Sequence, residues 1–152
     1  MIKLIDVAHV TLNVTDMDRA LKFYTEVLGF RVVVRFDGLV LLNFGQYRDG
    51  IEGIGYGFHD LALYRVPSPA PDDYRTRVGM NHLAFRVRTP EELDQAASEL
   101  QAKGVELLKG PLLHKEDRDR YLYIEDPDHN VIELVASTLP GWPETFLVKS
   151  EK

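Results

Sequence analysis

The stretch RYLYIEDPDHNVIELV, residues 120–135, has the pattern of a β-hairpin. Its aromatic and β-branched run YLYI and its apolar run VIELV flank the segment DPDHN, whose residue types favour a turn. Because side chains alternate between the two faces of a strand, Glu133 shares a face with Val131 and Val135. A carboxylate on such a face needs water, a partner or a metal ion. The hairpin therefore predicts either an edge strand with a solvated Glu133 or a strand in which Glu133 is a ligand.

Composition narrows both the fold and the chemistry. The 152 residues are enough for one domain, or for two fused half-modules, with a sizeable core. The 18 Lys and Arg residues against 24 Asp and Glu residues give a net charge of −6, which argues against nucleic acid or an anionic membrane as a partner. The sequence has no Cys, so any metal site must use His, Asp and Glu.

The sequence also predicts where the protein works. No apolar run is long enough to span a bilayer, and the N-terminal MIKLIDVAHV alternates like a strand and lacks the apolar core of a signal peptide. The absence of Cys fits a reducing compartment. We therefore expect a cytoplasmic protein without a membrane partner.

Each half of the chain predicts one helix among four strands. The first half is expected to contain a strand at 7–14, a helix capped by Thr15 or Asp16 and ended by Gly29, strands at 30–36 and 39–44, a glycine-rich loop at 45–57 and a strand at 58–66. The second half is expected to contain a strand at 81–87, a helix with a capping box at Thr89–Glu92 and an end at Gly104, and strands at 105–108, 121–125 and 131–135. A proline-rich connection separates the halves.

The two halves look like a diverged duplication. When they are superposed at His9 and His82, both show a Val five residues later, a capped helix and a closing Gly, at offsets of 20 and 22 residues. The predicted fold is therefore α+β, with two paired βαβββ modules that form a curled mixed sheet around a metal-binding cleft with the helices outside. The expected boundaries are 1–66 for module one, 67–79 for the linker, 80–136 for module two and 137–152 for a tail.

The residues His9, His82 and Glu133 lie on expected strands that would line one cleft. Two imidazoles and one carboxylate form the facial triad that suits Fe(II) and leaves coordination positions open. Each His alone is more often a core or surface residue, but their equivalent places in the repeat and the unexplained Glu133 favour a joint metal site.

With this ligand order the sequence resembles the vicinal oxygen chelate (glyoxalase/bleomycin resistance/dioxygenase) superfamily over nearly its whole length. Its metal-binding members include glyoxalases, fosfomycin-inactivating transferases and extradiol catechol dioxygenases. His114, Asp117 and Tyr123 lie 19, 16 and 10 residues before Glu133, where the extradiol enzymes carry His, Asp and Tyr. His59 looks like their acid/base His. Asp117 in a charged loop and Tyr123 in a strand have ordinary structural readings as well.

The resemblance implies a small extradiol dioxygenase, similar to catechol 2,3-dioxygenase, that opens a catecholic ring with O₂. It implies Fe(II), with Mn(II) as the alternative ion, and roles for His114 and Tyr123 as donors to the substrate oxygens. Two features depart from the family. His129 stands where the family usually has Gly, at a position that favours a left-handed backbone. The chain also has one pair of modules, whereas the better-known extradiol enzymes have two.

Three alternatives stay open. A glyoxalase-like isomerase or lyase usually needs a Glu or Gln on the fourth strand, and residues 58–66 contain neither. A fosfomycin-type transferase needs a cationic site for its substrate, and the acidic composition of this chain does not indicate such a site. A non-enzymatic binding protein on this scaffold commonly lacks the triad.

Free sheet edges and the tail PGWPETFLV, residues 140–148, predict a homodimer or a higher homo-oligomer.

Overall fold

In the computed structural model the chain folds into two compact units. The structure describes residues 1–4, 7–45 and 59–141. Most of the predicted glycine-rich loop and the aromatic part of the tail lie outside the described residues. Unit 1 comprises Met1–Thr76 and Asp126–Asn130, and unit 2 comprises Arg77–Glu125 and Val131–Lys152. No helix among the described residues is long and apolar enough to cross a membrane.

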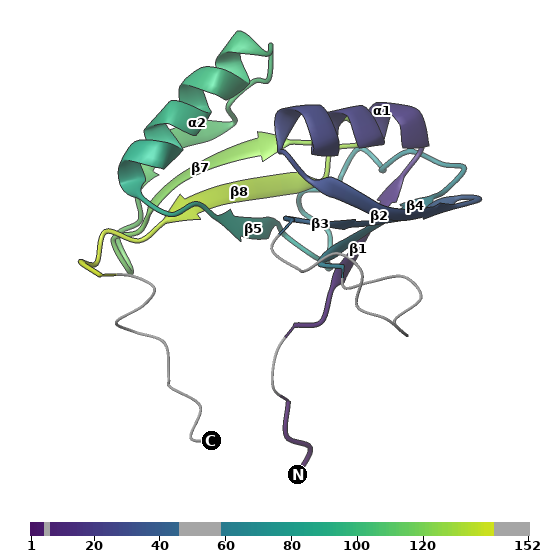
Figure 1. The fold of residues 1–152 in the computed structure, drawn as a ribbon, viewed down its shortest axis with the longest axis horizontal. Coiled ribbons are helices and arrows are strands. Elements are labelled where there is room, and N and C mark those ends of the chain that lie inside the picture. Colours follow the sequence, from purple (N-terminus) through teal and green to yellow (C-terminus); the bar gives the residue numbers. More distant parts are fainter. Residues whose placement is uncertain (5–6, 46–58, 142–152) are drawn as a thin grey trace. The chain divides into compact units, whose positions relative to one another are not determined.

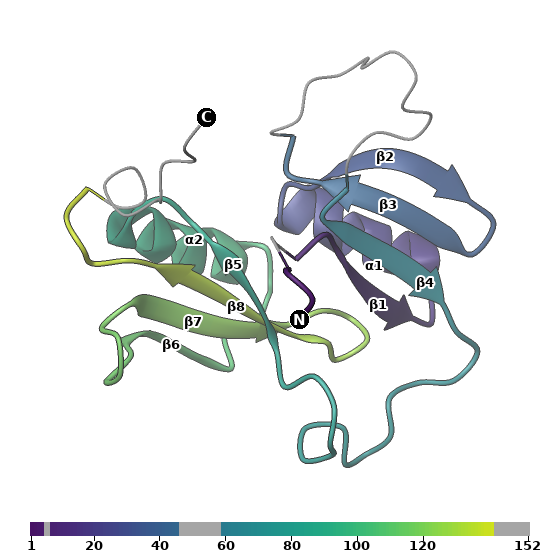
Figure 2. The same cartoon turned by 90° about the horizontal axis from the view of Figure 1, so that it is seen from below.

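Unit 1 is a βαβββ module. Its elements are β1 (Val10–Val14), α1 (Met17–Lys22), the π-helical segment η1 (Phe23–Val27), β2 (Arg31–Phe36), β3 (Leu39–Asn43) and β4 (Leu61–Arg65). Its strands lie in the order β1-β4-β3-β2, with β1 parallel to β4 and the other neighbours antiparallel (Figure 2). The helix α1 covers one face of this sheet (Figure 1).

The sequence explains both ends of the helical segment in unit 1. The Asp16 carboxylate accepts a hydrogen bond from the backbone N–H of Arg19 at 3.0 Å, so Asp16 and not Thr15 is the N-cap of α1. Gly29 has a φ of 79°, a left-handed conformation that only glycine adopts without strain. On the helix side of the sheet, Leu12 and Leu63 pair across β1 and β4 and are almost fully buried.

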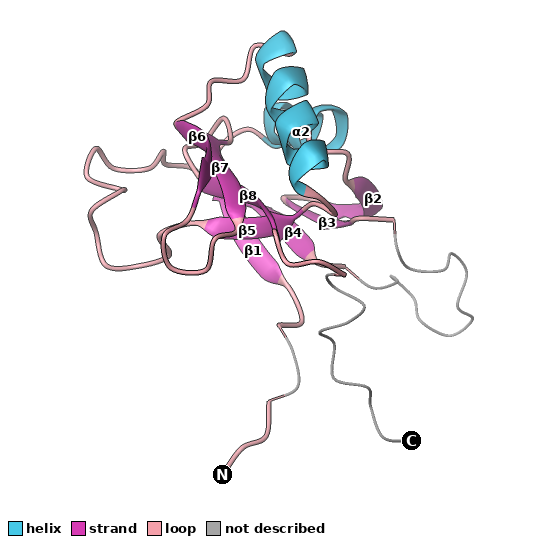
Figure 3. Cartoon of the chain, turned by 90° about the vertical axis from the view of Figure 1, so that its left-hand side faces the viewer, coloured by secondary structure: helices cyan, strands magenta, loops and turns pink. Residues whose placement is uncertain are grey.

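Unit 2 repeats this module. Its elements are β5 (Leu83–Arg86), α2 (Pro90–Ala102), β6 (Lys109–Leu113), β7 (Arg120–Glu125) and β8 (Val131–Ala136). The strand order β5-β8-β7-β6 matches that of unit 1, and β5 is again parallel to its neighbour β8. α2 lies along one face of β7 and β8 (Figure 3). The predicted α+β class and the two βαβββ modules are confirmed, with one four-stranded mixed sheet in each module.

The two faces of the sheet in unit 2 differ in polarity. The face toward α2 contains Leu122, Ile124 and Ile132, all fully buried. Arg120 is on the same side of β7 and donates its Nε–H to Asp94 of α2 at 2.8 Å. Since side chains alternate along β7, Tyr121 and Tyr123 point to the opposite face, where Glu133 also lies. Unit 2 therefore packs its core on the helix side and carries Glu133 and two tyrosines on the other side.

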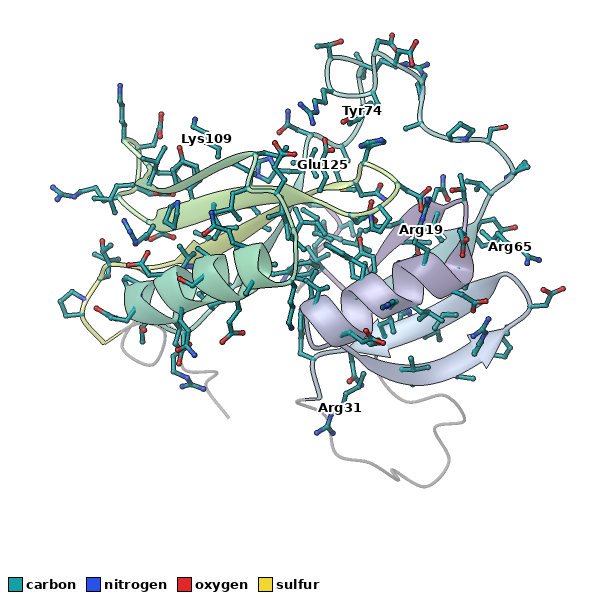
Figure 4. The ribbon with its side chains drawn as sticks, turned by 90° about the horizontal axis from the view of Figure 1, so that it is seen from above. Arg19, Arg31, Arg65, Tyr74, Lys109 and Glu125 are labelled. Atoms are coloured by element: carbon teal, nitrogen blue, oxygen red, sulfur yellow. The ribbon has the colours of Figure 1, made fainter. Side chains whose placement is uncertain are left out.

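The turn between β7 and β8 belongs to unit 1. Asp126 accepts hydrogen bonds from the Tyr24 hydroxyl at 2.8 Å and from the backbone N–H of Asn130 at 2.9 Å. Asp128 accepts hydrogen bonds from Thr15 and from Arg19, whose side chain rises from α1 (Figure 4). These polar contacts join residues far apart in the sequence, and no local pattern indicates them.

Several predicted element boundaries were wrong. The strands expected at 7–14, 58–66 and 81–87 begin later than predicted, so His9, His59 and His82 precede β1, β4 and β5 instead of lying in them. The ladder between β1 and β4 explains the later starts of these two strands, since its first pair is Val10–Leu61.

The strand predicted at 105–108 is also wrong, because the strand is β6 at Lys109–Leu113. Its Gly110 and Pro111 look like loop residues, but β6 is an edge strand, where a missing N–H is tolerated. Gly110 has a φ of 88°, and a Cβ there would lie 2.5 Å from the carbonyl oxygen of Tyr121. Gly110, which looks like a loop residue, is thus the residue that lets β6 approach β7 so closely.

Candidate metal centre

The register of unit 2 places three residues in one row across the sheet. Glu133 on β8 pairs with Ala84 on β5 and with Tyr123 on β7. Paired residues on neighbouring strands point to the same face, so Tyr123 lies beside the carboxylate and Ala84 leaves room next to it. Glu133 is only 5% exposed. A carboxyl group this deeply buried needs partners within unit 2.

Two imidazoles supply such partners from opposite sides. His82 Nε2 lies 3.1 Å from Glu133 Oε2, and His114 Nε2 lies 2.7 Å from Glu133 Oε1. His82 directly precedes β5, and His114 directly follows β6. The structure therefore brings together two of the three predicted ligands, His82 and Glu133. It also places His114, predicted as a substrate contact, against the carboxylate.

Asn81 fixes the ring of His82. The Nδ1 atom of His82 lies 2.7 Å from the amide oxygen of Asn81. An amide oxygen only accepts hydrogen bonds, so Nδ1 donates a proton to Asn81. The other ring nitrogen, Nε2, faces a carboxylate oxygen, so a proton or a cation lies between these two atoms. Metal-binding His residues typically donate their second ring N–H to an oxygen in this way.

The spacing of His82 and Glu133 also fits a metal ion. Two ligands about 2.1 Å from one ion, at adjacent octahedral positions, stand about 3 Å apart. The observed distance from His82 Nε2 to Glu133 Oε2 is 3.1 Å. Within residues 1–4, 7–45 and 59–141, no three His, Asp or Glu side chains form a group that could hold a metal ion as they stand. The third predicted ligand, His9, belongs to unit 1.

Aromatic rings surround the Glu133 carboxylate. The His114 ring stacks on Tyr121 at 3.7 Å between centroids and an interplanar angle of 10°. Lys109 Nζ lies 5.6 Å from the Tyr121 ring centroid (labelled in Figure 4). Tyr123 contacts both Tyr121 and His82 edge to face. Burial raises the pKa of Tyr123 above its ordinary value of 10.0, and the charge of Glu133, the neighbouring Tyr121 and the hydrogen bond to Glu133 raise it further.

Unit 1 holds the other predicted pair. The rings of His9 and His59 lie 4.6 Å apart between centroids, at an interplanar angle of 34°. Burial lowers the pKa of His59 from its ordinary value of 6.5, the neighbouring His9 lowers it further, and Asp60 opposes both. The β4 strand that follows, LALYR, contains no Glu or Gln. Among the described residues, the ring that lies next to His9 is therefore the imidazole of His59.

Two other predicted positions have structural roles. The exposed Asp117 accepts a hydrogen bond from the backbone N–H of Asp119 at 2.9 Å, which shapes the turn between β6 and β7. His129 has a φ of 67°, so the predicted left-handed conformation is confirmed. Its ring stacks on Tyr74 at 5.3 Å, a contact that a Gly at this position would lack.

Sequence reasoning missed two residues of this site. Asn81 had a signal, since a polar side chain directly before a candidate ligand can reach the ring of that ligand. Tyr121 is part of the predicted strand run YLYI, and its stack on His114 depends on the pairing of β6 with β7. The register shift in that pairing has no local sequence signal.

Comparison with known proteins gives a consistent result. A family model described as the Glyoxalase/Bleomycin resistance protein/Dioxygenase superfamily matches residues 6–134. A lactoylglutathione lyase of Schizosaccharomyces pombe is 29% identical over 146 residues, which cover 86% of this chain and 47% of that protein. Biphenyl-2,3-diol 1,2-dioxygenase 2 of Rhodococcus globerulus is 29% identical over 127 residues, which cover 84% of this chain and 60% of that protein.

Among solved structures, a glyoxalase/dioxygenase from Nostoc punctiforme superposes with a TM-score of 0.69 at 23% identity. The match covers 88% of this chain and 92% of that chain. At this identity the likeness supports the fold alone. The chain spans about half the length of the yeast lyase and 60% of the dioxygenase.

Proposed function

The chain belongs to the glyoxalase/bleomycin resistance protein/dioxygenase superfamily, and we propose that it is an Fe(II)-dependent extradiol dioxygenase that opens a catecholic ring with O₂. The proposed metal ligands are His9, His82 and Glu133. The observation that carries the choice within the superfamily is the pair of rings in unit 1, where the imidazole of His59 lies beside the proposed ligand His9 and the strand β4 that follows His59 contains no Glu or Gln. The similarity to a named dioxygenase supports the same choice.

The residues of the chain would share the work as follows. His9, His82 and Glu133 would hold an Fe(II) ion, which would supply binding of a catechol and of O₂. Asn81 holds the Nδ1–H of His82, so that Nε2 is free to bind metal. His59 would accept a proton from a substrate hydroxyl and later donate one as the O–O bond breaks. Asp117 is exposed in the turn between β6 and β7, so we propose that it contributes to the reaction only from the periphery of the site.

Tyr123 is the proposed donor to a substrate oxygen. Its hydroxyl now donates to Glu133 and can rotate about the C–O bond toward another acceptor. The rings of Tyr121 and Tyr123 add an aromatic surface to this face of unit 2, which suits a planar aromatic substrate.

The test is an oxygen-uptake assay. Purified protein is loaded anaerobically with Fe(II), then mixed with a panel of substituted catechols in an oxygen electrode. We expect oxygen uptake together with a yellow ring-cleavage product. Stoichiometric iron binding without uptake on any catechol would overturn the proposal.

A lactoylglutathione lyase-like activity is the second candidate, and the name of the yeast relative favours it. Such an enzyme would act as an isomerase or lyase with Ni²⁺ or Zn²⁺ and would consume no oxygen. Assays of the Ni²⁺- and Zn²⁺-loaded protein with the hemithioacetal of a thiol and a 2-oxoaldehyde separate the two candidates. A third candidate is non-enzymatic binding of a small molecule. It predicts no turnover with Fe(II), Ni²⁺ or Zn²⁺.

We also propose that the protein forms a homodimer or higher homo-oligomer in the cytoplasm. Both sheets end in strands with exposed apolar side chains, Val32 and Phe36 on β2 and Leu112 and Leu113 on β6. Light scattering at micromolar concentration should give a multiple of the 17.4 kDa chain mass. A monomer mass would contradict this proposal without bearing on the reaction.

A further inference from the structure

The two oxygens of Glu133 are held in different ways. Oε2 lies 3.1 Å from His82 Nε2, and the Nδ1–H of the same ring is held by the amide oxygen of Asn81. Oε1 lies 2.7 Å from His114 Nε2, a short distance for an N–H···O hydrogen bond and typical of bonds to a charged acceptor. His82 therefore has the second-nitrogen contact typical of a metal ligand, whereas His114 makes the shorter contact with the carboxylate.

The ring of His114 has little freedom to point elsewhere. It lies flat on Tyr121, with an interplanar angle of 10°, and Lys109 lies over the Tyr121 ring as well. An imidazole N–H is fixed in the plane of its ring, so tilting the ring to direct this N–H out of that plane would break the stack. A phenol O–H, such as that of Tyr123, can change its acceptor by a rotation about one bond. Tyr123 can therefore turn its O–H toward another acceptor, whereas the stacked ring of His114 favours Glu133 as its acceptor.

We propose that His114 is a positioning residue that orients the Glu133 carboxylate and does not bind the substrate. It donates its Nε2–H to Oε1, which leaves Oε2, the oxygen opposite His82, as the atom that binds the metal. This role differs from the one that the family resemblance implies for His114. It rests on the proposed metal site, in which His82 and Glu133 are ligands, and it holds for any metal-dependent reaction at that site.

The proposal has a chemical consequence. With Oε1 engaged by His114, Glu133 would offer its other oxygen, Oε2, to the metal. Loss of that donor leaves Oε1 buried without its partner and lets the carboxylate rotate. Groups that hydrogen-bond a metal ligand change metal affinity by roughly 10- to 100-fold when they are removed. A residue that touches only the substrate changes KM and leaves metal affinity unaltered.

Two substitutions and one control test the role. His114→Phe keeps a flat ring on Tyr121 and removes the donor, whereas His114→Gln keeps an N–H donor. The control is Lys115→Ala, at the next residue, which is exposed in the same loop. We measure the Kd for Mn(II) by electron paramagnetic resonance. We expect His114→Phe to raise the Kd by about 10- to 100-fold, His114→Gln to recover most of the affinity and Lys115→Ala to match wild type.

Metal-free protein supplies a second readout. Nitrogen-15 NMR of the His114 side chain should show a hydrogen-bonded Nε2–H in wild type, and this signal should change in Glu133→Gln. An unchanged Mn(II) Kd in a folded His114→Phe protein whose KM for a catechol rises would overturn the positioning role and return His114 to the substrate. A protein that loses Mn(II) affinity in His114→Phe but consumes no oxygen with any catechol would keep the positioning role and overturn the dioxygenase.

Discussion

The two units share one strand order, but the sheet faces opposite their helices carry different chemistry. In unit 1 the row across β1, β4 and β3 is Thr11, Ala62 and Leu41. In unit 2 the row across β5, β8 and β7 is Ala84, Glu133 and Tyr123. The rows are equivalent because each lies one residue after the first pair of the parallel ladder in its unit.

Ala62 and Glu133 therefore occupy the same place in the two sheets. They are 2% and 5% exposed. The module accepts a small apolar side chain here, and a buried carboxylate costs free energy unless it is bound. The fold alone does not call for Glu133, and its presence is explained by the imidazoles and the phenol that surround it.

The largest expected effect comes from giving unit 2 the residue that unit 1 has. Glu133→Ala should abolish tight metal binding and turnover, and His9→Ala and His82→Ala should do the same, because a three-ligand site loses most of its affinity with any one ligand. Metal content by mass spectrometry and oxygen uptake measure both effects, with the exposed Glu106→Ala as a control. One metal per chain at wild-type affinity in Glu133→Ala would show that the two rows do not differ in metal binding.

The next largest effect concerns His59, the second imidazole of unit 1. His59→Phe should leave iron content intact while it lowers the oxygen-uptake rate by about 10²- to 10⁴-fold, the usual contribution of a positioned proton-transfer group. His129→Asn is the matched control, since it removes a His outside the site at a left-handed position that Asn tolerates. Loss of iron from His59→Phe would instead make His59 a ligand, and an unchanged rate would remove it from the reaction.

The sequence predicted the repeat because its signals are local. Helix caps, closing glycines and alternating strands depend on residues within a few positions of one another, and Asp16, Gly29, Thr89 and Gly104 all act as expected. His82 was predicted from its place in the repeat, which is equivalent to that of His9, and Glu133 was predicted from its unexplained charge on a strand. The boundary at β6 failed because Gly110 and Pro111 are acceptable only on an edge strand, which local pattern does not show.

The contacts that the sequence did not predict join distant residues. Tyr24 and Asp126 are 102 residues apart, and Thr15 and Asp128 are 113 residues apart. The hydrogen bond of His114 to Glu133 depends on two ladders and on a register shift in β6. Each of these needs the fold to be known first.

The buried bond of Tyr24 distinguishes the helical segments of the two units, since α2 is anchored by apolar contacts at Leu93 and Leu100. Tyr24→Phe should lower the free energy of unfolding by about 1–3 kcal/mol at pH 7, because Asp126 loses a buried donor. Chemical denaturation measures this loss. Tyr64→Phe, at an exposed tyrosine of β4, should change little.

The same bond predicts a dependence on pH. Burial, with the charge of Asp126 next in size, raises the pKa of Tyr24 well above its ordinary value of 10.0. A group with a raised folded pKa stabilises the fold fully below its unfolded pKa and loses that contribution as the pH rises toward the folded value. The stability gap between wild type and Tyr24→Phe should therefore shrink above about pH 10. A gap that stays constant or widens there would contradict the buried bond.

The smallest effect compares the two helix caps. Asp16 accepts from the Arg19 N–H at 3.0 Å, and Thr89 accepts from the Glu92 N–H at 3.2 Å. Loss of such a cap costs about 1 kcal/mol. α2 has further support at its start, since Pro90 is preset for the first helical position and the Glu92 carboxylate accepts from the Arg88 N–H at 3.1 Å.

α1 has less support, because it is only six residues long before η1 begins. Asp16→Ala should therefore destabilise the protein more than Thr89→Ala does, with both losses near 1 kcal/mol. Amide hydrogen exchange localises each effect, since the Arg19 N–H should exchange faster in Asp16→Ala and the Glu92 N–H should exchange faster in Thr89→Ala. If Thr89→Ala proves the more damaging of the two, helix α2 depends on its cap hydroxyl more than on Pro90 and Glu92, and the helix starts of the two units are supported in the opposite order.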